Sequence, residues 1–265
     1  WALRDAVIDD ENNLWIATLS YWGVIRYNLN TKKTEDFTNE KDDTNSLGST
    51  KFWCIIKARN GEIWAGSDKE GLFRYNPKTK YKKKFGSVKN NENSLPSNHI
   101  KCIHEDVDGS LWLGTEGGLC HFDPINEKII KNYSQENGLS NNIIYGILED
   151  KNDNLWLTSD NGLTCFNKKT EKTKVYNISN GLINSEFNIN SYFKNDKGEF
   201  YIGGVSGFDK FHPDNMQINP NPAVPIITEF KISNTKVGPG EKYNGKIIYD
   251  CNLNYSESLN LSWKE

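Results

Sequence analysis

The chain has 265 residues, of which 32 are lysine or arginine and 35 are aspartate or glutamate, so its net charge is −3. Charges this nearly balanced give no electrostatic case for binding nucleic acid or an anionic membrane surface. No apolar run approaches the roughly 20 residues that a membrane-spanning helix needs.

A dipeptide of one apolar residue followed by tryptophan or tyrosine recurs five times, at intervals of 44 to 49 residues. The residues around each copy repeat as well, so the period defines a structural unit. Repeats of this length are typical of the blades of a β-propeller. The five copies are Leu14-Trp15, Ile63-Trp64, Leu111-Trp112, Leu155-Trp156 and Phe200-Tyr201.

Each unit is predicted to form four short strands in the same order. The first strands are expected at 3–8, 52–56, 100–104, 144–148 and 189–193. A tight turn follows, at which glycine or asparagine supplies a positive φ: Asn60-Gly61, Asp108-Gly109 and Lys197-Gly198, with Asn12-Asn13 and Asn152-Asp153 in the other two units. After the tryptophan strand, a third strand begins at a glycine, at 71–75, 118–122 and 162–166. A lysine-rich fourth strand ends at Phe37, Phe85, Tyr133 and Tyr176.

We therefore predict an all-β fold in which residues 1–218 form five four-stranded propeller blades, as part of a larger propeller. The tryptophans of the repeat are expected in the core between blades, because large aromatic side chains fill the space between twisted sheets. The lysines of 78–84 lie on an outer strand, where they are expected to protect a solvated sheet edge.

The repeats stop near Met216. Residues 219–225 contain three prolines and are predicted to form a stiff linker. Residues 226–265 follow, with strands expected at 226–232, 246–249 and 258–263. Three strands in about 40 residues cannot bury a substantial core. We interpret 226–265 as the N-terminal part of an Ig-like β-sandwich.

The five cysteines form no CxxC pair and no metal-ligand spacing. Cys54 and Cys102 occupy the same aligned position, where the other units carry Asp5, Gly146 and Ser191. That position favours a small buried side chain with a free thiol. A disulfide between neighbouring inner strands is the alternative, and the cysteines alone leave the redox compartment open.

Two stretches resemble a known family. Leu95-Pro96-Ser97-Asn98-His99, Asp108-Gly109-Ser110-Leu111-Trp112 and Gly118-Leu119 resemble the two-component regulator propeller repeat, and 138–163 repeats the match. The tail, at 227–230 and 253–263, is similar to the start of the Ig-like triple-tyrosine domain that follows such propellers.

The resemblance implies the periplasmic or extracellular sensing region of a bacterial inner-membrane receptor, in many cases a hybrid histidine kinase that detects oligosaccharides. It further implies a homodimeric intact receptor, attached to the membrane through a segment outside these residues. No kinase or other catalytic motif occurs in the chain, and we expect no cofactor and no nucleic-acid partner. Family propellers usually have seven blades. Three alternatives are therefore open. Either further blades lie upstream of these residues, or the five blades close into a ring alone, or a second copy of the chain completes the surface.

Ligand-binding residues are expected on the loops at one mouth of the central channel, because rigid blades hold those loops in place. At one position on the first strand the residue differs from unit to unit, although the neighbouring positions are structurally invariant. Such variation is expected at the rim of a channel that binds one ligand. Amides, carboxylates and aromatic side chains there suit sugar hydroxyls and C–H faces. The candidates are Arg4, Tyr21, Trp22, Trp53, Asp68, Asn98, His99, Lys101, Glu116, Asn142, Tyr145, Asp160 and Asn190.

Three other interpretations fit parts of the sequence. A propeller that binds a protein partner at its mouth is the main alternative. A metal-dependent lyase would need channel histidines, but only His99 lies near the mouth, and no catalytic set follows from the spacing. Asp106-Val107-Asp108-Gly109 and 150–154 faintly resemble calcium loops, but they coincide with the first hairpin of a blade and lack a later glutamate at the required spacing. We therefore expect no metal site.

Overall fold

The computed structural model describes residues 2–20, 22–37, 51–89, 91, 93–216 and 228–249. The chain divides into two compact units, Trp1–Gln217 and Ile218–Glu265. Within the described residues the first unit is built of strands and three single-turn 3-10 helices, η1 (Gln135–Asn137), η2 (Ile178–Asn180) and η3 (Pro213–Asn215). No helix in these ranges is long and apolar enough to cross a membrane.

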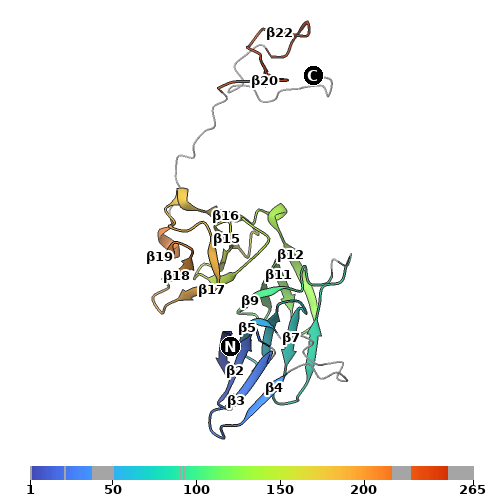
Figure 1. Ribbon diagram of the computed structural model, residues 1–265, viewed down its shortest axis with the longest axis vertical. Coiled ribbons are helices and arrows are strands. Elements are labelled where there is room, and N and C mark those ends of the chain that lie inside the picture. Colours follow the sequence, from blue (N-terminus) through green and yellow to red (C-terminus); the bar gives the residue numbers. More distant parts are fainter. Residues whose placement is uncertain are drawn as a thin grey trace. The chain divides into compact units, whose positions relative to one another are not determined.

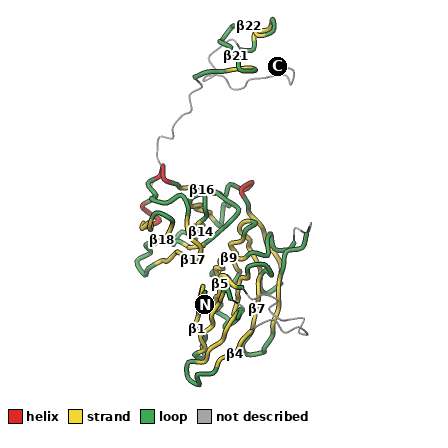
Figure 2. Tube along the Cα trace, in the orientation of Figure 1, coloured by secondary structure: helices red, strands yellow, loops and turns green. Residues whose placement is uncertain are grey.

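The first unit is a propeller of five antiparallel sheets, which we call blades one to five (Figures 1 and 2). The strands of each blade pair in chain order. Blade one is β1 (Leu3–Ile8), β2 (Asn13–Thr18), β3 (Val24–Asn28) and β4 (Thr34–Phe37); blade two is β5 (Phe52–Lys57), β6 (Ile63–Ser67), β7 (Leu72–Tyr75) and β8 (Lys82–Phe85); blade three is β9 (Ile100–Glu105), β10 (Leu111–Thr115), β11 (Gly118–Asp123) and β12 (Lys128–Tyr133); blade four is β13 (Gly146–Glu149), β14 (Asn154–Thr158), β15 (Leu163–Asn167) and β16 (Thr173–Tyr176); blade five is β17 (Phe187–Lys194), β18 (Phe200–Gly204) and β19 (Gly207–Phe211).

The predicted fifth blade differs from the structure in two respects. Its sheet has three strands in the described residues, because the chain enters η3 directly after β19. The first strand of this blade also begins at Phe187, two residues earlier than expected. The other four blades have the four strands predicted for them.

The first hairpin turn of each blade carries a residue with a positive φ, as the sequence predicts. Gly61, Gly109 and Gly198 have φ values of +85°, +86° and +80°. Asn12 and Asp153 adopt φ values of 59° and 60° in blades one and four. Glycine, asparagine and aspartate tolerate the left-handed region better than most residues. The residue type at this position therefore determines the turn between the first and second strands of every blade.

Aromatic side chains fill each interface between consecutive blades. Trp15 of blade one, for example, lies 5.1 Å from Phe37 of its own blade and 5.3 Å from Tyr75 of blade two, measured between ring centroids. The repeat tryptophans are at most 2% exposed, which confirms their predicted place in the core. The corresponding trios of the next three interfaces are Trp64, Phe85 and Phe122; Trp112, Tyr133 and Phe166; and Trp156, Tyr176 and Phe211.

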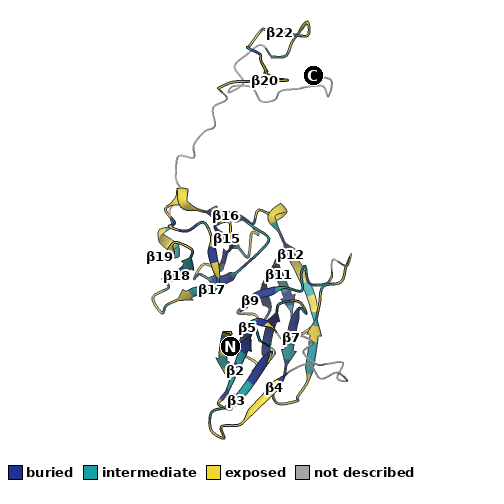
Figure 3. Cartoon of the chain, viewed as in Figure 1, coloured by how far each residue is buried: buried dark blue, intermediate teal, exposed yellow. Residues whose placement is uncertain are grey.

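Burial differs between the strands of a blade (Figure 3). Every residue of β6 and β10 is buried, whereas three of the four residues of the outer strand β4 are exposed. Each of the four apolar clusters in the described residues joins two consecutive blades, and none joins blade five to blade one. Leu3 of blade one and Phe193 and Phe208 of blade five are accordingly about 60% exposed.

Close packing near the axis explains the small residues of the inner strands. Cys54, Cys102 and Cys120 are free and buried, and Cys165 is free and partly buried. Burial raises the pKa of the Cys102 thiol far above its ordinary value, so it is protonated and unreactive. A Cβ added to Gly114 would overlap Cys102 Sγ and lie 2.9 Å from Ile144 Cγ2.

Gly114→Ala is therefore expected to lower the free energy of unfolding by about 1–3 kcal/mol, the usual cost of overpacking a core. Denaturant unfolding followed by far-UV circular dichroism measures it. Adding Cys102→Ala to this variant removes one of the overlapping atoms and should recover part of the loss. An unchanged stability of Gly114→Ala would show that the inner strands are less tightly packed than the structure indicates.

The second unit contains two short hairpins in its described residues, β20 (Lys231–Ile232) with β21 (Thr235–Lys236) and β22 (Lys242–Tyr243) with β23 (Lys246–Ile247). The strands expected at 226–232 and 246–249 are thus shorter than predicted, because residues 228–230 and 248–249 have no strand pairing. The linker at 219–225 and the strand expected at 258–263 lie outside the described residues. An Ig-like sandwich stays a prediction.

Candidate functional site

The first strands of blades one to three each contain a one-residue β-bulge. The extra residues are Arg4, Trp53 and Lys101, three of the predicted ligand-binding residues. A bulge leaves its extra residue outside the ladder and re-aims its side chain, which is why bulges are common beside binding sites. The pairs that enclose each extra residue are Leu3–Thr18 and Asp5–Ala17, Phe52–Ser67 and Cys54–Gly66, and Ile100–Thr115 and Cys102–Gly114.

Blades four and five place their aligned residues differently. Tyr145 comes directly before β13, and its backbone N–H donates to Thr158 O over 2.8 Å. In β17, regular pairing is lost between Phe187 and Tyr192, and Asn190 lies in this irregular stretch with a φ of 57°. We call the five aligned residues, Arg4, Trp53, Lys101, Tyr145 and Asn190, the bulge ring.

Trp53 is the centre of the bulge ring. The Arg4 guanidinium carbon lies 4.8 Å from the centroid of the Trp53 ring, and Lys101 Nζ lies 4.3 Å from it. Asn190 Nδ2 donates to Trp53 O over 2.6 Å, which links blade five to blade two. The indole N–H donates to Asp68 Oδ1 over 2.8 Å. Four of the predicted candidates therefore contact a fifth directly, and cation–π attraction holds two of them there.

Lys101 is a buried cation, only 4% exposed, with two carboxylates beside it. Its Nζ lies 2.8 Å from Glu116 Oε1 and 3.9 Å from Asp68 Oδ1. His99 Nδ1 lies 3.5 Å from Glu116 Oε2. Burial alone would raise the pKa of Asp68, but the Trp53 hydrogen bond and the Lys101 charge outweigh it, and the pKa is lowered. Asp68 and Glu116 therefore neutralise Lys101 within the protein.

A cavity of about 510 Å³ lies against the bulge ring. Arg4 and Trp53 line it together with Tyr145 and Asp160, and residues from the irregular stretch of β17, the loop before it and the turn between β18 and β19 complete the lining. Burial, and then the charges of Asp160, Glu116 and Glu186, raise the pKa of Tyr145, so its hydroxyl stays a hydrogen-bond donor at neutral pH. The cavity thus combines aromatic faces with donors and acceptors, as sites for small molecules do.

Two other predicted candidates, Asn98 and Asn142, form hydrogen bonds to neighbouring loops. Asn98 Oδ1 accepts a hydrogen bond from Ser87 N over 2.6 Å, and Asn142 Oδ1 accepts one from Gln135 N over 2.8 Å. Both side chains hold loops in place. Trp22 is 42% exposed, and Tyr21 lies outside the described residues. A role of these four residues in ligand binding stays a prediction.

An aspartate six residues before the repeat tryptophan is a structural residue that our sequence interpretation missed. Trp112 Nε1 donates to Asp106 Oδ2 over 2.8 Å, and Trp15 and Trp156 donate in the same way to Asp9 and Asp150. The six-residue spacing was visible in three units and could have revealed it. Asp106 and Asp150 therefore belong to hairpins, and the described residues contain no group of three or more potential metal ligands.

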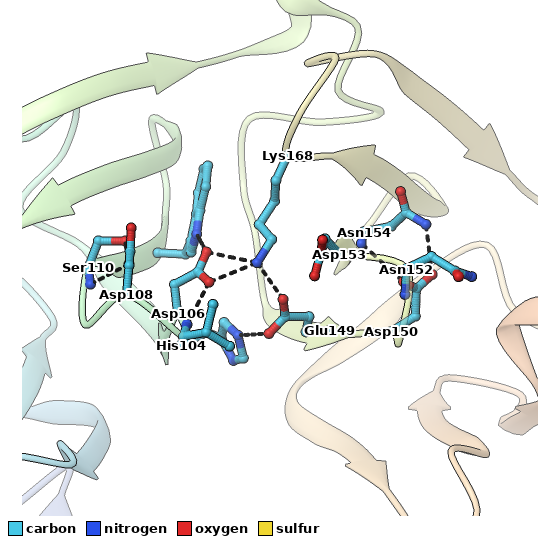
Figure 4. A network of polar contacts seen from close by, with 12 residues as sticks. His104, Asp106, Asp108, Ser110, Glu149, Asp150, Asn152, Asp153, Asn154 and Lys168 are labelled. Atoms are coloured by element: carbon cyan, nitrogen blue, oxygen red, sulfur yellow. Dashed lines mark hydrogen bonds and ion pairs between the residues drawn. The ribbon is translucent and has the colours of Figure 1, made fainter.

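The charged network around Asp106 joins blade three to blade four (Figure 4). Lys168 Nζ lies 2.8 Å from Asp106 Oδ1 and also pairs with Glu149. His104 Nε2 lies 3.0 Å from Glu149 Oε2. His121 stacks on Trp112 with ring centroids 3.9 Å apart and contacts Ser110 Oγ. Ser110 Oγ also donates to Asp108 Oδ1 over 2.6 Å, so these polar contacts hold the first hairpin of blade three.

Comparison with known proteins agrees with the repeat and the fold. The two-component regulator propeller family matches residues 94–117 and 138–161. A 98-residue stretch, 37% of this chain, is 32% identical to histidine kinase P4 of Formosa agariphila and spans 7% of that protein. The sequence resemblance to this repeat is thereby confirmed.

Two solved structures illustrate the likeness of fold. The extracellular domain of the hybrid two-component system BT3049 from B. thetaiotaomicron has a TM-score of 0.71 at 17% identity, over 82% of this chain and 29% of that one. Virginiamycin B lyase from Staphylococcus aureus has a TM-score of 0.55 at 16% identity, over 80% of this chain and 70% of that one. At these identities both show the propeller fold alone.

Proposed function

We propose that this chain, a propeller that carries two-component regulator repeats, is the ligand-sensing region of a bacterial two-component receptor. The matched repeats and the fold of the BT3049 extracellular domain support this role. The observation that carries it is the bulge ring: equivalent positions of five blades, which structural repetition would keep alike, hold five different side chains, and three of them, Arg4, Trp53 and Tyr145, line one cavity.

An oligosaccharide is the proposed ligand. Trp53 is partly exposed and lines the cavity beside Arg4, so its indole supplies aromatic surface for contact with the C–H groups of a sugar ring. Arg4 and the Tyr145 hydroxyl supply donors, and Asp160 and Glu186 supply acceptors for sugar hydroxyls. A pocket with aromatic walls and a few polar groups fixes the orientation of a ligand and determines its specificity.

The cellular setting follows from the same proposal. The sensing region lies in the periplasm or outside the cell, and the parent receptor, a histidine kinase like the Formosa agariphila relative, carries the output. An Ig-like module formed by 226–265 and the residues after it relays ligand occupancy across the membrane through a homodimer. The intact receptor then contains the catalytic parts that no motif in this chain supplies.

A glycan screen tests the proposal, because a ligand that binds only the folded state raises its melting temperature by mass action. We expect at least one oligosaccharide to do so. Trp53→Ala should weaken its binding about tenfold or more in calorimetry, as truncation of a central aromatic anchor commonly does. Tyr81→Ala is the matched control, because Tyr81 is an exposed aromatic residue on the outer side of the same blade.

The outcomes separate the alternatives. A protein partner that raises the melting temperature, with no effect from any glycan, would favour the protein-interaction platform. Metal-dependent turnover abolished by His99→Ala would favour the lyase. Equal glycan binding by Trp53→Ala and the parent would show that the bulge ring is not part of the ligand-binding site.

A further inference from the structure

The cavity beside the bulge ring has more negative than positive charge on its walls. Arg4 is the single cation among the residues that line it, whereas Asp160 and Glu186 are both acidic and both exposed. Asp160 Oδ1 accepts a hydrogen bond from Asn141 Nδ2 over 2.5 Å, a neutral partner. Neither acidic side chain forms an ion pair with any described residue. The lining therefore has a formal charge of −1 at neutral pH.

Lys101 does not compensate this charge. It is buried, is not among the residues that line the cavity, and is already neutralised by Glu116 and Asp68. Counting these three groups and Lys51, whose charge also acts on Asp68, the cavity and its surroundings hold three cations and four carboxylates. His99, which lies beside Glu116, would add a positive charge only when protonated.

Arg4 is held in a way that leaves its N–H groups available. Its guanidinium stacks against Trp53, and it forms no ion pair with a described residue. Its donors can therefore point to the oxygen atoms of a ligand. The carboxylates of Asp160 and Glu186, in turn, can each accept hydrogen bonds from hydroxyl groups but repel an anion.

We propose that the cavity takes uncharged saccharides and discriminates against saccharides that carry carboxylate or sulfate groups; this inference rests on the proposed sensing function. A neutral sugar offers both donors and acceptors and so satisfies Arg4 and the two carboxylates together. An anionic sugar keeps hydroxyl donors, but its carboxylate or sulfate groups would bring like charges close to Asp160 and Glu186, and this repulsion weakens binding.

Calorimetry with two panels of oligosaccharides of equal length tests this inference. The neutral panel contains gluco-, galacto-, manno-, xylo- and arabino-oligosaccharides, and the anionic panel contains oligogalacturonate, chondroitin sulfate and sulfated galactan oligosaccharides. We expect the best neutral compound to bind at least about tenfold more tightly than any anionic one. Lower salt should widen this difference, because repulsion between exposed charges is screened by ions.

Glu186→Gln and Glu186→Arg supply the matched variants. The first should narrow the preference for neutral compounds several-fold, and the second should improve binding of the anionic panel about tenfold. Glu11→Gln is the control, because Glu11 is an exposed glutamate in the first hairpin turn of blade one, outside the cavity. Glu186 is exposed, so unchanged melting temperatures are expected for all three variants.

The results distinguish the two proposals. Tighter binding of an anionic compound, or an unchanged preference in Glu186→Arg, would overturn the selection for uncharged sugars while the sensing function stands. No binding by either panel would instead contradict the sensing function itself.

Discussion

Trp112→Ala is expected to lower the free energy of unfolding by about 3–5 kcal/mol, the usual range for truncating a buried aromatic side chain. Trp112 lies between blades three and four, with its ring centroid 5.7 Å from that of Phe166 across the interface. Its loss would open a cavity there and remove the indole donor from Asp106. Urea unfolding followed by far-UV circular dichroism measures the change.

Trp112→Phe separates packing from hydrogen bonding. Phenylalanine keeps an aromatic ring against His121 but cannot donate to Asp106, which Lys168 still contacts. We therefore expect a smaller loss than in Trp112→Ala. A loss below about 1 kcal/mol for Trp112→Ala would mean that this interface is not part of a cooperative core, since surface substitutions fall in that range.

Local chemistry made most of the fold predictable from the sequence. The turn residues Gly61, Gly109 and Gly198 and the buried tryptophans are set by the chain within each unit, so the blade period was sufficient to place them. The end of the propeller was harder. The sequence period does not tell whether the residues after Phe211 form a fourth strand or a helical turn. An outer strand buries few side chains, so its pairing leaves only a weak pattern in the sequence.

The position of the candidate site was predictable from the sequence, but the bulges and contacts that build it were not. Alignment of the units drew attention to Arg4, Trp53 and Lys101. The bulges that re-aim these side chains depend on which residues pair across β1–β2, β5–β6 and β9–β10, and one sequence does not show pairing. The contact of Asn190 with Trp53 joins residues 137 positions apart in the chain, so the repeat pattern could not reveal it.

Lys168→Met is expected to lower the free energy of unfolding at neutral pH by about 3 kcal/mol. Removing one partner of a buried ion pair leaves an uncompensated charge, which commonly costs 3–5 kcal/mol; we use the lower end because the three side chains keep some contact with water. Lys168 lies between Asp106 and Glu149 and so joins the two carboxylates of adjacent blades (Figure 4). Denaturant unfolding of parent and variant measures the effect.

Lys131→Met is the matched control, because Lys131 pairs with Glu171 at a site where both side chains are more than 40% exposed. Such pairs contribute little, so its stability should stay close to that of the parent. Equal losses in both lysine variants would contradict the special role of Lys168.

The loss in Lys168→Met should also depend on pH. The hydrogen bond from His104, with those from Lys168, lowers the pKa of Glu149. Burial alone would raise the pKa of Asp106, but the hydrogen bonds from Lys168 and Trp112 lower it. Groups with lowered pKa values stabilise the fold above their ordinary values of 4.5 and 3.8, and this contribution is lost as pH falls through the folded-state values. The parent and Lys168→Met should therefore converge in stability as the pH falls from 7 to about 3, whereas a constant difference would assign the loss to packing of the lysine side chain instead of its charge.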